Sequence, residues 1–295
     1  MLSEIVFIIF PIVAIVTSGY LYAKRFQTDM EVANRLNLNI FLPALLFSVF
    51  TSKEFNLLDF QFLALGGIAV ILISGLMAYL ISKVLGFELK TFVPPLMFVN
   101  SGNMGLPLAL FAFGKPAIPA AVVLFFIENT LHFTLGIKIL DKSSSIIKVM
   151  RIPMVVASII GVIISLSAYT VPTLIITPVK MMGEIAIPLM LFSLGVRLVE
   201  IDFNDWKIGI IGAISRPVIG IVSVLLILPW ISLSNLNTAQ LIIFAILPPA
   251  VLNFMVAEKY NQEPKKVASI VLIGNLFSLI SVPTALYFLL PGLQT

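Results

Sequence analysis

The sequence predicts an all-α, polytopic membrane protein with ten transmembrane helices, arranged as two inverted five-helix repeats. The chain is 60% hydrophobic and only 11% charged, with a mean hydropathy of +1.12, which is outside the range of soluble globular proteins. Apolar stretches of about 20 residues, long enough to cross a bilayer, recur along its 295 residues. Short strings from the first half also recur, in the same order, in the second half.

Ten apolar stretches are expected to span the lipid bilayer, with about 20 residues as the yardstick. We number as spans 1 to 10 roughly residues 3–23, 34–52, 60–84, 91–113, 116–139, 152–170, 179–199, 207–231, 238–257 and 265–290. The connections are short, so no soluble domain is expected. The string "MLSEIVFIIF" has no basic region ahead of its apolar residues, which argues against a cleavable signal peptide.

The basic residues predict the orientation of the chain in the membrane. Most of the 18 Lys and Arg residues lie in the connections after spans 1, 3, 5, 7 and 9, whereas the other side carries Lys53, Lys115 and Lys180. Positive charge accumulates on the cytoplasmic side. We therefore expect a multi-pass protein of the cell inner (plasma) membrane with both termini outside the cytoplasm. The same boundary residues account for the pI near 9.3, so no nucleic-acid partner is expected.

An internal repeat relates the two halves. "NIFLPALLFS" (39–48) recurs as "EIAIPLMLFS" (184–193), and two weaker echoes match "PPLMFVN" (94–100) with "PPAVLNF" (248–254) and "IEN" (127–129) with "IGN" (273–275). These strings fall in spans 2/7, 4/9 and 5/10. With five spans per copy, the second copy enters the membrane from the opposite side, as in many secondary transporters. The predicted units are residues 1–140 and 151–295, joined by a cytoplasmic connection at 141–150.

Spans 4 and 9 contain residues that interrupt a helix. Such interruptions persist in a bilayer where they are buried in protein or line a cavity, and paired broken helices mark the substrate site of inverted-repeat transporters. The candidate substrate-binding residues are Asn100, Ser101, Gly102, Asn103, Gly105, Pro107, Pro248, Pro249 and Asn253. A purely structural role is the alternative, in which the amides cap the half-helices while the glycines and Pro107 shape the backbone.

Span 5 carries polar residues near its middle. Glu128 and His132 are spaced to share one helix face with Asn129 beside them, and Asn275 is the repeat counterpart of Asn129. Ionisable residues inside a membrane usually serve as substrate, proton or ion sites, so these four are a candidate coupling site or polar ring. A structural pair is the alternative. Arg216 in span 8 either faces an anionic substrate or reaches toward the cytoplasm, and the length of the span favours the second.

Three strings carry a resemblance to a known family: "NRLNLNIFLPALLFS", "NSGNMGLP" and "LPPAVLNFMVAEKYNQEP". In these the chain resembles the auxin efflux carrier family, which includes bacterial dicarboxylate permeases and plant PIN-type auxin carriers. Without a long central hydrophilic loop, it is similar to compact prokaryotic-type members. The resemblance implies a scaffold of spans 1, 2, 6 and 7, a transport domain of spans 3–5 and 8–10, a crossing of spans 4 and 9 at the substrate site, elevator-like movement and a homodimer.

The resemblance also implies roles for individual residues. Asn100 corresponds to the residue that contacts the substrate carboxylate, and Pro248 corresponds to the crossover proline. Asn253 stands where PIN-type carriers tend to have a second proline, which makes the cavity more polar and argues against an indole-sized auxin.

The sequence and the resemblance thus predict a secondary transporter of a small organic anion, a mono- or dicarboxylate or an auxin-like molecule, with no cofactor or metal site. They leave open whether sodium, a proton or neither is coupled to transport. The alternatives are a sodium-coupled organic-anion symporter of the bile-acid-transporter type, and a channel or sensor on the same scaffold. No enzyme is expected, because HExxH, GxSxG and paired-aspartate signatures are missing. A GxxxxGK[ST] motif is missing too, so ATP is not the energy source.

Overall fold

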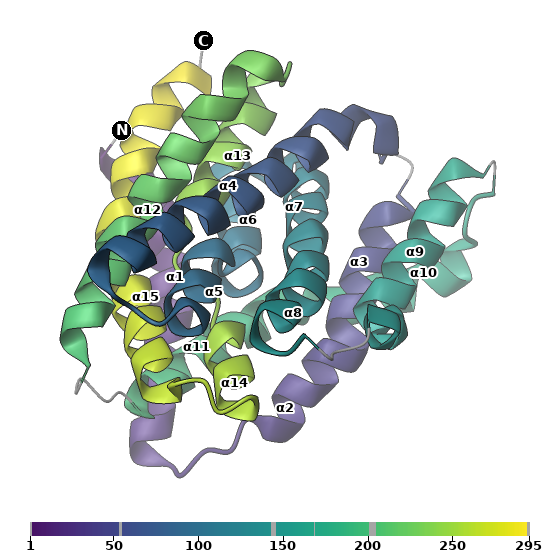
Figure 1. Cartoon of the computed structure of the whole chain (residues 1–295). Helices are drawn as coiled ribbons and strands as arrows, with labels where there is room; N and C mark the ends of the chain where they lie inside the picture. The colour runs from purple at the N-terminus through teal and green to yellow at the C-terminus, as the bar shows by residue number, and fades with distance from the viewer. Residues whose placement is uncertain (1, 53–54, 143–145, 168, 201–204, 294–295) are drawn as a thin grey trace.

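The computed structural model describes residues 2–52, 55–142, 146–167, 169–200 and 205–293. Lys53 and part of the predicted connection at 141–150 lie outside these ranges. The regular structure of the described residues is helical, apart from one isolated β-bridge. Both chain ends lie at one end of the bundle, and α2 (Glu31–Leu36) and α14 (Leu252–Lys259) lie at the other (Figure 1).

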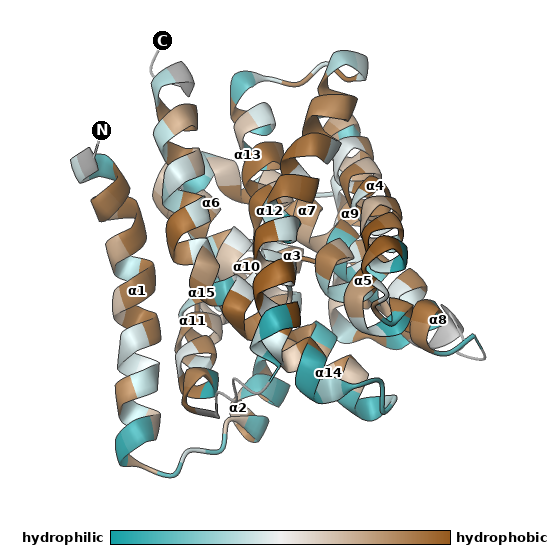
Figure 2. Cartoon of the chain, turned by 60° about the vertical axis from the view of Figure 1, so that its left-hand side comes forward, coloured by the Kyte–Doolittle hydropathy of each residue, from teal (hydrophilic) through white to brown (hydrophobic). Residues whose placement is uncertain are grey.

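Seven helical segments in the described ranges are long and apolar enough to cross a membrane. They are Ser3–Arg25, Glu31–Phe50, Leu57–Leu85, Lys115–Leu140, Thr173–Arg197, Trp206–Trp230 and Pro264–Leu289. Three shorter apolar helices, Ser101–Phe113, Pro153–Leu166 and Asn235–Ile246, lie where the sequence predicts spans 4, 6 and 9. Hydrophobic residues cover most of the length of these helices, and hydrophilic residues gather around α2 and α14 (Figure 2). The predicted all-helical, multi-pass architecture is confirmed in this coarser form.

Several predicted spans are built from more than one helical segment. Besides α2, α14 and short 3-10 turns, the helical elements are α1 (Leu2–Arg25), η1 (Asn37–Phe41), α3 (Leu42–Phe50), α4 (Gln61–Leu85), α5 (Leu89–Met97), η3 (Ser101–Gly105), α6 (Leu106–Phe113), α7 (Ile118–Leu131), η5 (His132–Gly136), α8 (Ile137–Leu140), α9 (Pro153–Leu166), α10 (Thr173–Glu184), α11 (Ala186–Arg197), α12 (Trp206–Ile227), α13 (Asn235–Ile246) and α15 (Pro264–Leu289). The wide π-helical turns η1 and η3 each end two residues before a proline, Pro43 and Pro107 respectively. Proline cannot donate to the preceding turn, and a wider turn accommodates its ring.

The helices pack in two groups. In the first, α1 lies against α11, and α3 lies against α9 and α10; in the second, α4 lies against α5, α7 and α12, and α12 lies against α13 and α15. Glycines allow the close approaches in the first group. A Cβ added to Gly19 in α1 would lie 2.2 Å from the Phe192 carbonyl oxygen of α11, and one added to Gly161 in α9 would lie 2.9 Å from Phe50 Cβ of α3.

One of the repeated strings, 94–100 against 248–254, does not have the same conformation in the two halves of the structure. Pro94 and Pro95 lie inside α5, whereas Pro248 and Pro249 lie in the extended segment after α13. The matching Pro-Pro strings are therefore not structural counterparts. Instead, Val99 pairs with Pro249 in an antiparallel bridge.

Candidate functional site

The broken helices of predicted spans 4 and 9 cross each other. Helix α5 ends at Met97 and α13 ends at Ile246, and the extended segments that follow meet at the Val99–Pro249 bridge. The Asn100 N–H donates to the Pro248 carbonyl at 2.8 Å, and the Ala250 N–H donates to the Phe98 carbonyl at 3.0 Å. Each interruption thereby satisfies backbone groups of the other, which lowers the cost of unwinding a helix inside a membrane.

Three buried asparagines form hydrogen bonds across the crossing. Asn100 Nδ2 donates to Asn275 Oδ1 at 3.0 Å, and Asn275 Nδ2 donates to the Pro249 carbonyl at 3.0 Å. Asn253 Nδ2 donates to the Phe98 carbonyl at 3.1 Å. All three side chains are buried, and Asn253 Oδ1 has no hydrogen-bond partner. The predicted polar residues therefore stabilise the crossing and leave one buried acceptor unused.

A second polar cluster lies next to the crossing, on α7 and η5. Ser101 Oγ donates to Glu128 Oε2 at 3.0 Å, and His132 Nδ1 lies 3.3 Å from Glu128 Oε1. The His132 ring stacks on Phe98, with centroids 4.3 Å apart and planes inclined by 7°. Glu128 and His132 are each 2% exposed, so the prediction that they share a buried helix face is confirmed.

This cluster does not have the order of a nucleophilic triad. In a serine hydrolase the imidazole stands between the serine and the carboxylate, so that it can take the serine proton. Here the Glu128 carboxylate stands between Ser101 and His132. The geometry therefore does not support a serine-hydrolase site at these residues.

Arg216 corrects one expectation. The sequence favoured a side chain that reaches toward the cytoplasm, but Arg216 is 1% exposed and lies among the helices of the second group. Its Nη1 lies 3.0 Å from the position of a Cβ on Gly220, a point only 1.7 Å from the Ala245 carbonyl oxygen. Burial disfavours the charged guanidinium, and the attraction of Glu128 and the negative end of half-helix α13 oppose that cost. Arg216 Nε and Nη1 have no hydrogen-bond partner.

The other predicted site residues occupy the margins of the crossing. Asn129 Nδ2 donates to the Phe125 carbonyl of its own helix at 3.0 Å, so it does not join its counterpart Asn275 at the crossing. Pro107 is buried in the first turn of α6, whereas Gly102, Asn103 and Gly105 are partly buried. The structure therefore gathers most, but not all, of the predicted residues into one region.

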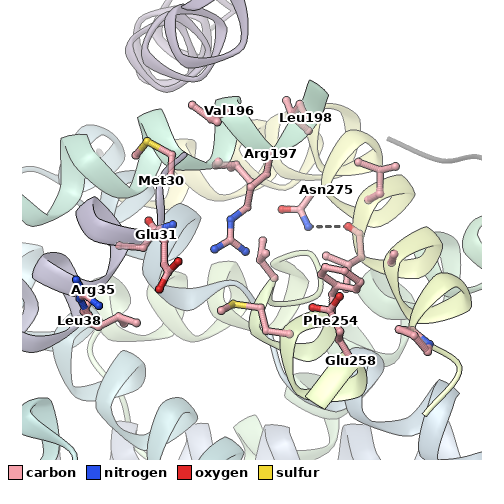
Figure 3. Close-up of a pocket in the computed structure, with 18 of the residues that line it drawn as sticks. Met30, Glu31, Arg35, Leu38, Val196, Arg197, Leu198, Phe254, Glu258 and Asn275 are labelled. Atoms are coloured by element: carbon pink, nitrogen blue, oxygen red, sulfur yellow. Dashed lines mark hydrogen bonds between the residues drawn. The ribbon is translucent and has the colours of Figure 1, made fainter. Parts of the chain in front are cut away.

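A cavity of about 1110 Å³ lies between the two helix groups and reaches Asn275. Residues of α2, α9 and α11 line one side, and residues of α14 and α15 line the other. Its lining contains both signs of charge: Arg35, Arg151, Arg197 and Lys265 against Asp29, Glu31, Asp205 and Glu258. The Arg197 side chain points into the cavity, with Glu31 and Glu258 on different sides of it (Figure 3). The volume is ample for a small organic ligand.

Sequence reasoning missed Gln240. This residue of α13 is 3% exposed, and neither its Nε2 nor its Oε1 has a hydrogen-bond partner. It lines a cavity of about 20 Å³ together with Ser101, Gly105 and Leu247, which is enough space for one water molecule. The signal was present in the sequence, because Gln240 interrupts an otherwise apolar run at the start of the broken span 9.

Comparison with known proteins identifies the family. A family described as "Membrane transport protein" matches residues 137–286, slightly more than half of the chain. The chain is also 23% identical to an "Uncharacterized transporter" of Methanocaldococcus jannaschii, over 93% of this chain and 96% of that protein. It is 23% identical to a "Putative malonate transporter" of Rhizobium meliloti, over 99% of this chain and 98% of that protein. The chain belongs to the membrane transport protein family of the auxin efflux carrier type.

Proposed function

We propose that this membrane transporter moves a small organic anion by an elevator-type alternating-access mechanism. The observation that carries the proposal is the crossing of two broken helices beside a cavity with walls from both helix groups. In secondary transporters such crossings hold the substrate near the middle of the bilayer. One helix group then serves as the scaffold (spans 1, 2, 6 and 7), and the other carries the crossing as the transport domain (spans 3–5 and 8–10).

An inverted repeat of two five-span units is supported by contacts between equivalent positions of the two halves. A two-fold axis between two halves brings equivalent residues into contact with each other. The bridge has this property, because the pair from Phe98 to Ala250 is mirrored by the pair from Pro248 to Asn100. Ser74 of α4 and Ser223 of α12 also meet, with Oγ atoms 3.3 Å apart.

The first helix group shows the same exchange of partners. Helix α1 packs on α11, and α9, which holds the corresponding place in the second half, packs on α3. Gly19 of α1 lies against Phe192, and a Cβ added to Gly161 of α9 would lie 3.6 Å from the Phe47 Cα. Phe47 and Phe192 are counterparts in the repeated string of spans 2 and 7. This agreement supports ten spans, with both termini on one side of the inner membrane.

The substrate we propose is a small dicarboxylate, with malonate as the first candidate. Helix N-termini attract anions through unpaired N–H groups, and two half-helices, η3–α6 and α14, begin at the crossing. The similarity to a protein named a malonate transporter favours the same substrate class. We propose that the predicted residues of both broken spans form the carboxylate site, with Asn253 holding the backbone that presents donors to it, and that scaffold helices pair in a homodimer.

Two alternatives make different predictions. For a sodium-coupled symporter, sodium would have to displace existing bonds, because both Glu128 carboxylate oxygens already contact Ser101 and His132. For a channel, flux would not be accelerated by substrate on the opposite side. The cavity reaches Asn275, which accepts a hydrogen bond from Asn100, and we take this contact to favour a carrier over a continuous pore.

The test uses purified protein in proteoliposomes with radiolabelled malonate. A carrier exchanges internal malonate for external malonate faster than it releases malonate into an empty solution. We expect Asn100→Ala and Asn253→Ala to lose most malonate binding and exchange, whereas Asn237→Ala, at the far end of α13, retains both. If wild-type protein exchanges neither malonate nor other small mono- and dicarboxylates, the proposed function is wrong. Wild-type exchange by both site variants would place the substrate elsewhere.

A further inference from the structure

We propose that His132 binds the coupled proton, so that the protein is a proton–anion symporter in which the protonated imidazole balances the charge of the substrate carboxylate. This inference rests on the proposed function and names its coupling ion. His132 is the only histidine of the 295-residue chain.

The position of His132 connects protonation with the crossing. Its ring lies flat on Phe98, in the extended segment that forms the bridge. The Phe98 carbonyl accepts hydrogen bonds from the Ala250 N–H and from Asn253 Nδ2. A charge that appears on the imidazole therefore arises directly beside the backbone that we propose holds the substrate.

The balance of buried charges near His132 favours one additional positive charge when an anion binds. Glu128 contributes one negative charge next to the ring, and the buried Arg216 of α12, which interacts electrostatically with Glu128, contributes one positive charge. With a neutral imidazole this cluster has no net charge. A bound carboxylate would then add an uncompensated negative charge in a region of low dielectric constant, which is costly. Protonation of His132 compensates the negative charge of one carboxylate group of the bound malonate.

No other charged side chain from the packed elements is buried next to the ring among the described residues. Helices α3, α6, α9 and α13 and segment η3, which also pack on α7, contain no Lys, Arg, Asp or Glu. Basic residues of four further neighbouring elements are exposed: Lys83 of α4, Lys115 of η4 (Lys115–Ala117), Lys138 of α8 and Arg151 of η6 (Ile146–Arg151). Lys90 of α5, which packs on α8, donates to the Leu140 carbonyl at 2.9 Å.

The donor set also fits a proton better than a metal cation. Imidazole gains and loses a proton between about pH 5 and pH 8, whereas the carboxylate oxygens of Glu128 and the amide groups of Asn100 and Asn275 are already engaged. The proton enters from water on one side, binds an imidazole nitrogen while malonate is bound, and leaves to water on the other side with the anion.

The first experiment measures accumulation. Proteoliposomes receive radiolabelled malonate with an inside-alkaline pH gradient, while potassium and valinomycin hold the voltage at zero. With one proton per anion, we expect about tenfold accumulation per pH unit, since a pH unit corresponds to about 1.4 kcal/mol. Proton uptake on malonate binding is recorded with a pH dye. His132→Asn, whose amide nitrogen can still donate to Glu128, should lose both signals. Glu263→Gln, a carboxylate outside the cluster, should retain them.

A second measurement needs no variant. Because the chain has one histidine, nitrogen-labelled histidine gives one pair of ring signals in nuclear magnetic resonance, and we expect the ring to become doubly protonated when malonate is added at pH 7.5. An unchanged ring overturns the inference, as does gradient-driven accumulation by His132→Asn. Malonate exchange without accumulation or proton uptake by wild-type protein would refute proton coupling and leave the transporter intact, whereas absence of any exchange would refute the proposed function.

Discussion

Replacement of Asn275 by alanine tests whether the hydrogen bonds of this side chain stabilise the crossing. The substitution removes the acceptor of Asn100 Nδ2 and the donor to the Pro249 carbonyl, and both partners are buried. Polar bonds between membrane helices contribute about 0.6–1.7 kcal/mol each, so the loss of two predicts about 1–3 kcal/mol. The third bond, from Asn275 Nδ2 to the Val271 carbonyl at 2.7 Å, lies within α15 and adds little between segments.

The assay compares thermal unfolding of detergent-solubilised Asn275→Ala, Ser281→Ala and wild-type protein. Ser281 lies further along the same helix, away from the crossing, so it controls for loss of a polar group from α15. At about 2–4 °C per kcal/mol, we expect the midpoint of Asn275→Ala to fall by a few °C to about 10 °C and that of Ser281→Ala to stay near wild type. Equal unfolding midpoints of Asn275→Ala and wild-type protein would show that these hydrogen bonds do not stabilise the crossing. Lost malonate exchange at an unchanged midpoint would instead assign Asn275 to substrate contact, which its place on the cavity wall allows.

Two further predictions concern packing and movement. Gly220→Ala should destabilise the protein more than Gly86→Ala, because the new Cβ at position 220 would lie 1.7 Å from the Ala245 carbonyl oxygen. Nothing lies within 4 Å of a Cβ on Gly86, whose φ of 72° costs only backbone strain. Comparison of the unfolding midpoints of the two variants checks this order. A thiol-reactive crosslinker between Leu38→Cys and Phe254→Cys, which line the large cavity from different helix groups, should block malonate exchange until it is cleaved, and full exchange by the crosslinked protein would exclude an elevator.

A pH effect on stability is expected at the start of α15. Glu263 accepts hydrogen bonds from Lys266 and from Thr91 Oγ1, the latter at 2.6 Å, and these bonds lower the pKa of the Glu263 carboxyl, with Lys266 the larger cause. A depressed pKa means that the stabilisation is present above the carboxyl's unfolded-state pKa and is lost as pH falls through its folded-state pKa. Glu263→Gln should therefore lower the unfolding midpoint at neutral pH and have a smaller effect in acid.

The sequence was most informative where helix-breaking residues lie in apolar surroundings. Asn100, Gly105 and Pro107 in one span, with Pro248 and Asn253 in another, predicted two interruptions that cost too much to exist without a partner. The structure supplies that partner by pairing the two segments with each other. That Glu128 and His132 share one helix face followed from their spacing, and the structure adds that this face is buried.

What the sequence could not predict was the environment of single polar groups. Arg216 sits in a span long enough for its charge to reach water, so only the fold reveals that Gly220 leaves space for the guanidinium beside the end of α13. The false Pro-Pro echo arose for a related reason. Proline occurs inside α5, which ends two residues after Pro95, and proline also suits an extended segment, so identical dipeptides occupy different conformations in α5 and after α13.

The crossing also explains why amides rather than charges occupy it. An asparagine both donates and accepts, so Asn275 can take a bond from Asn100 while it gives one to Pro249, and neither group needs a counter-ion. The unused atom at the crossing, Asn253 Oδ1, is an acceptor, and a carboxylate is also an acceptor. A carboxylate must therefore find its donors among the N–H groups at the beginnings of η3 and α14, while Asn253 holds the backbone that presents them. On this reasoning Asn253→Asp, which removes the donor to Phe98 and adds a negative charge, should lower malonate affinity more than Asn253→Ala, and equal affinities for the two variants would contradict it.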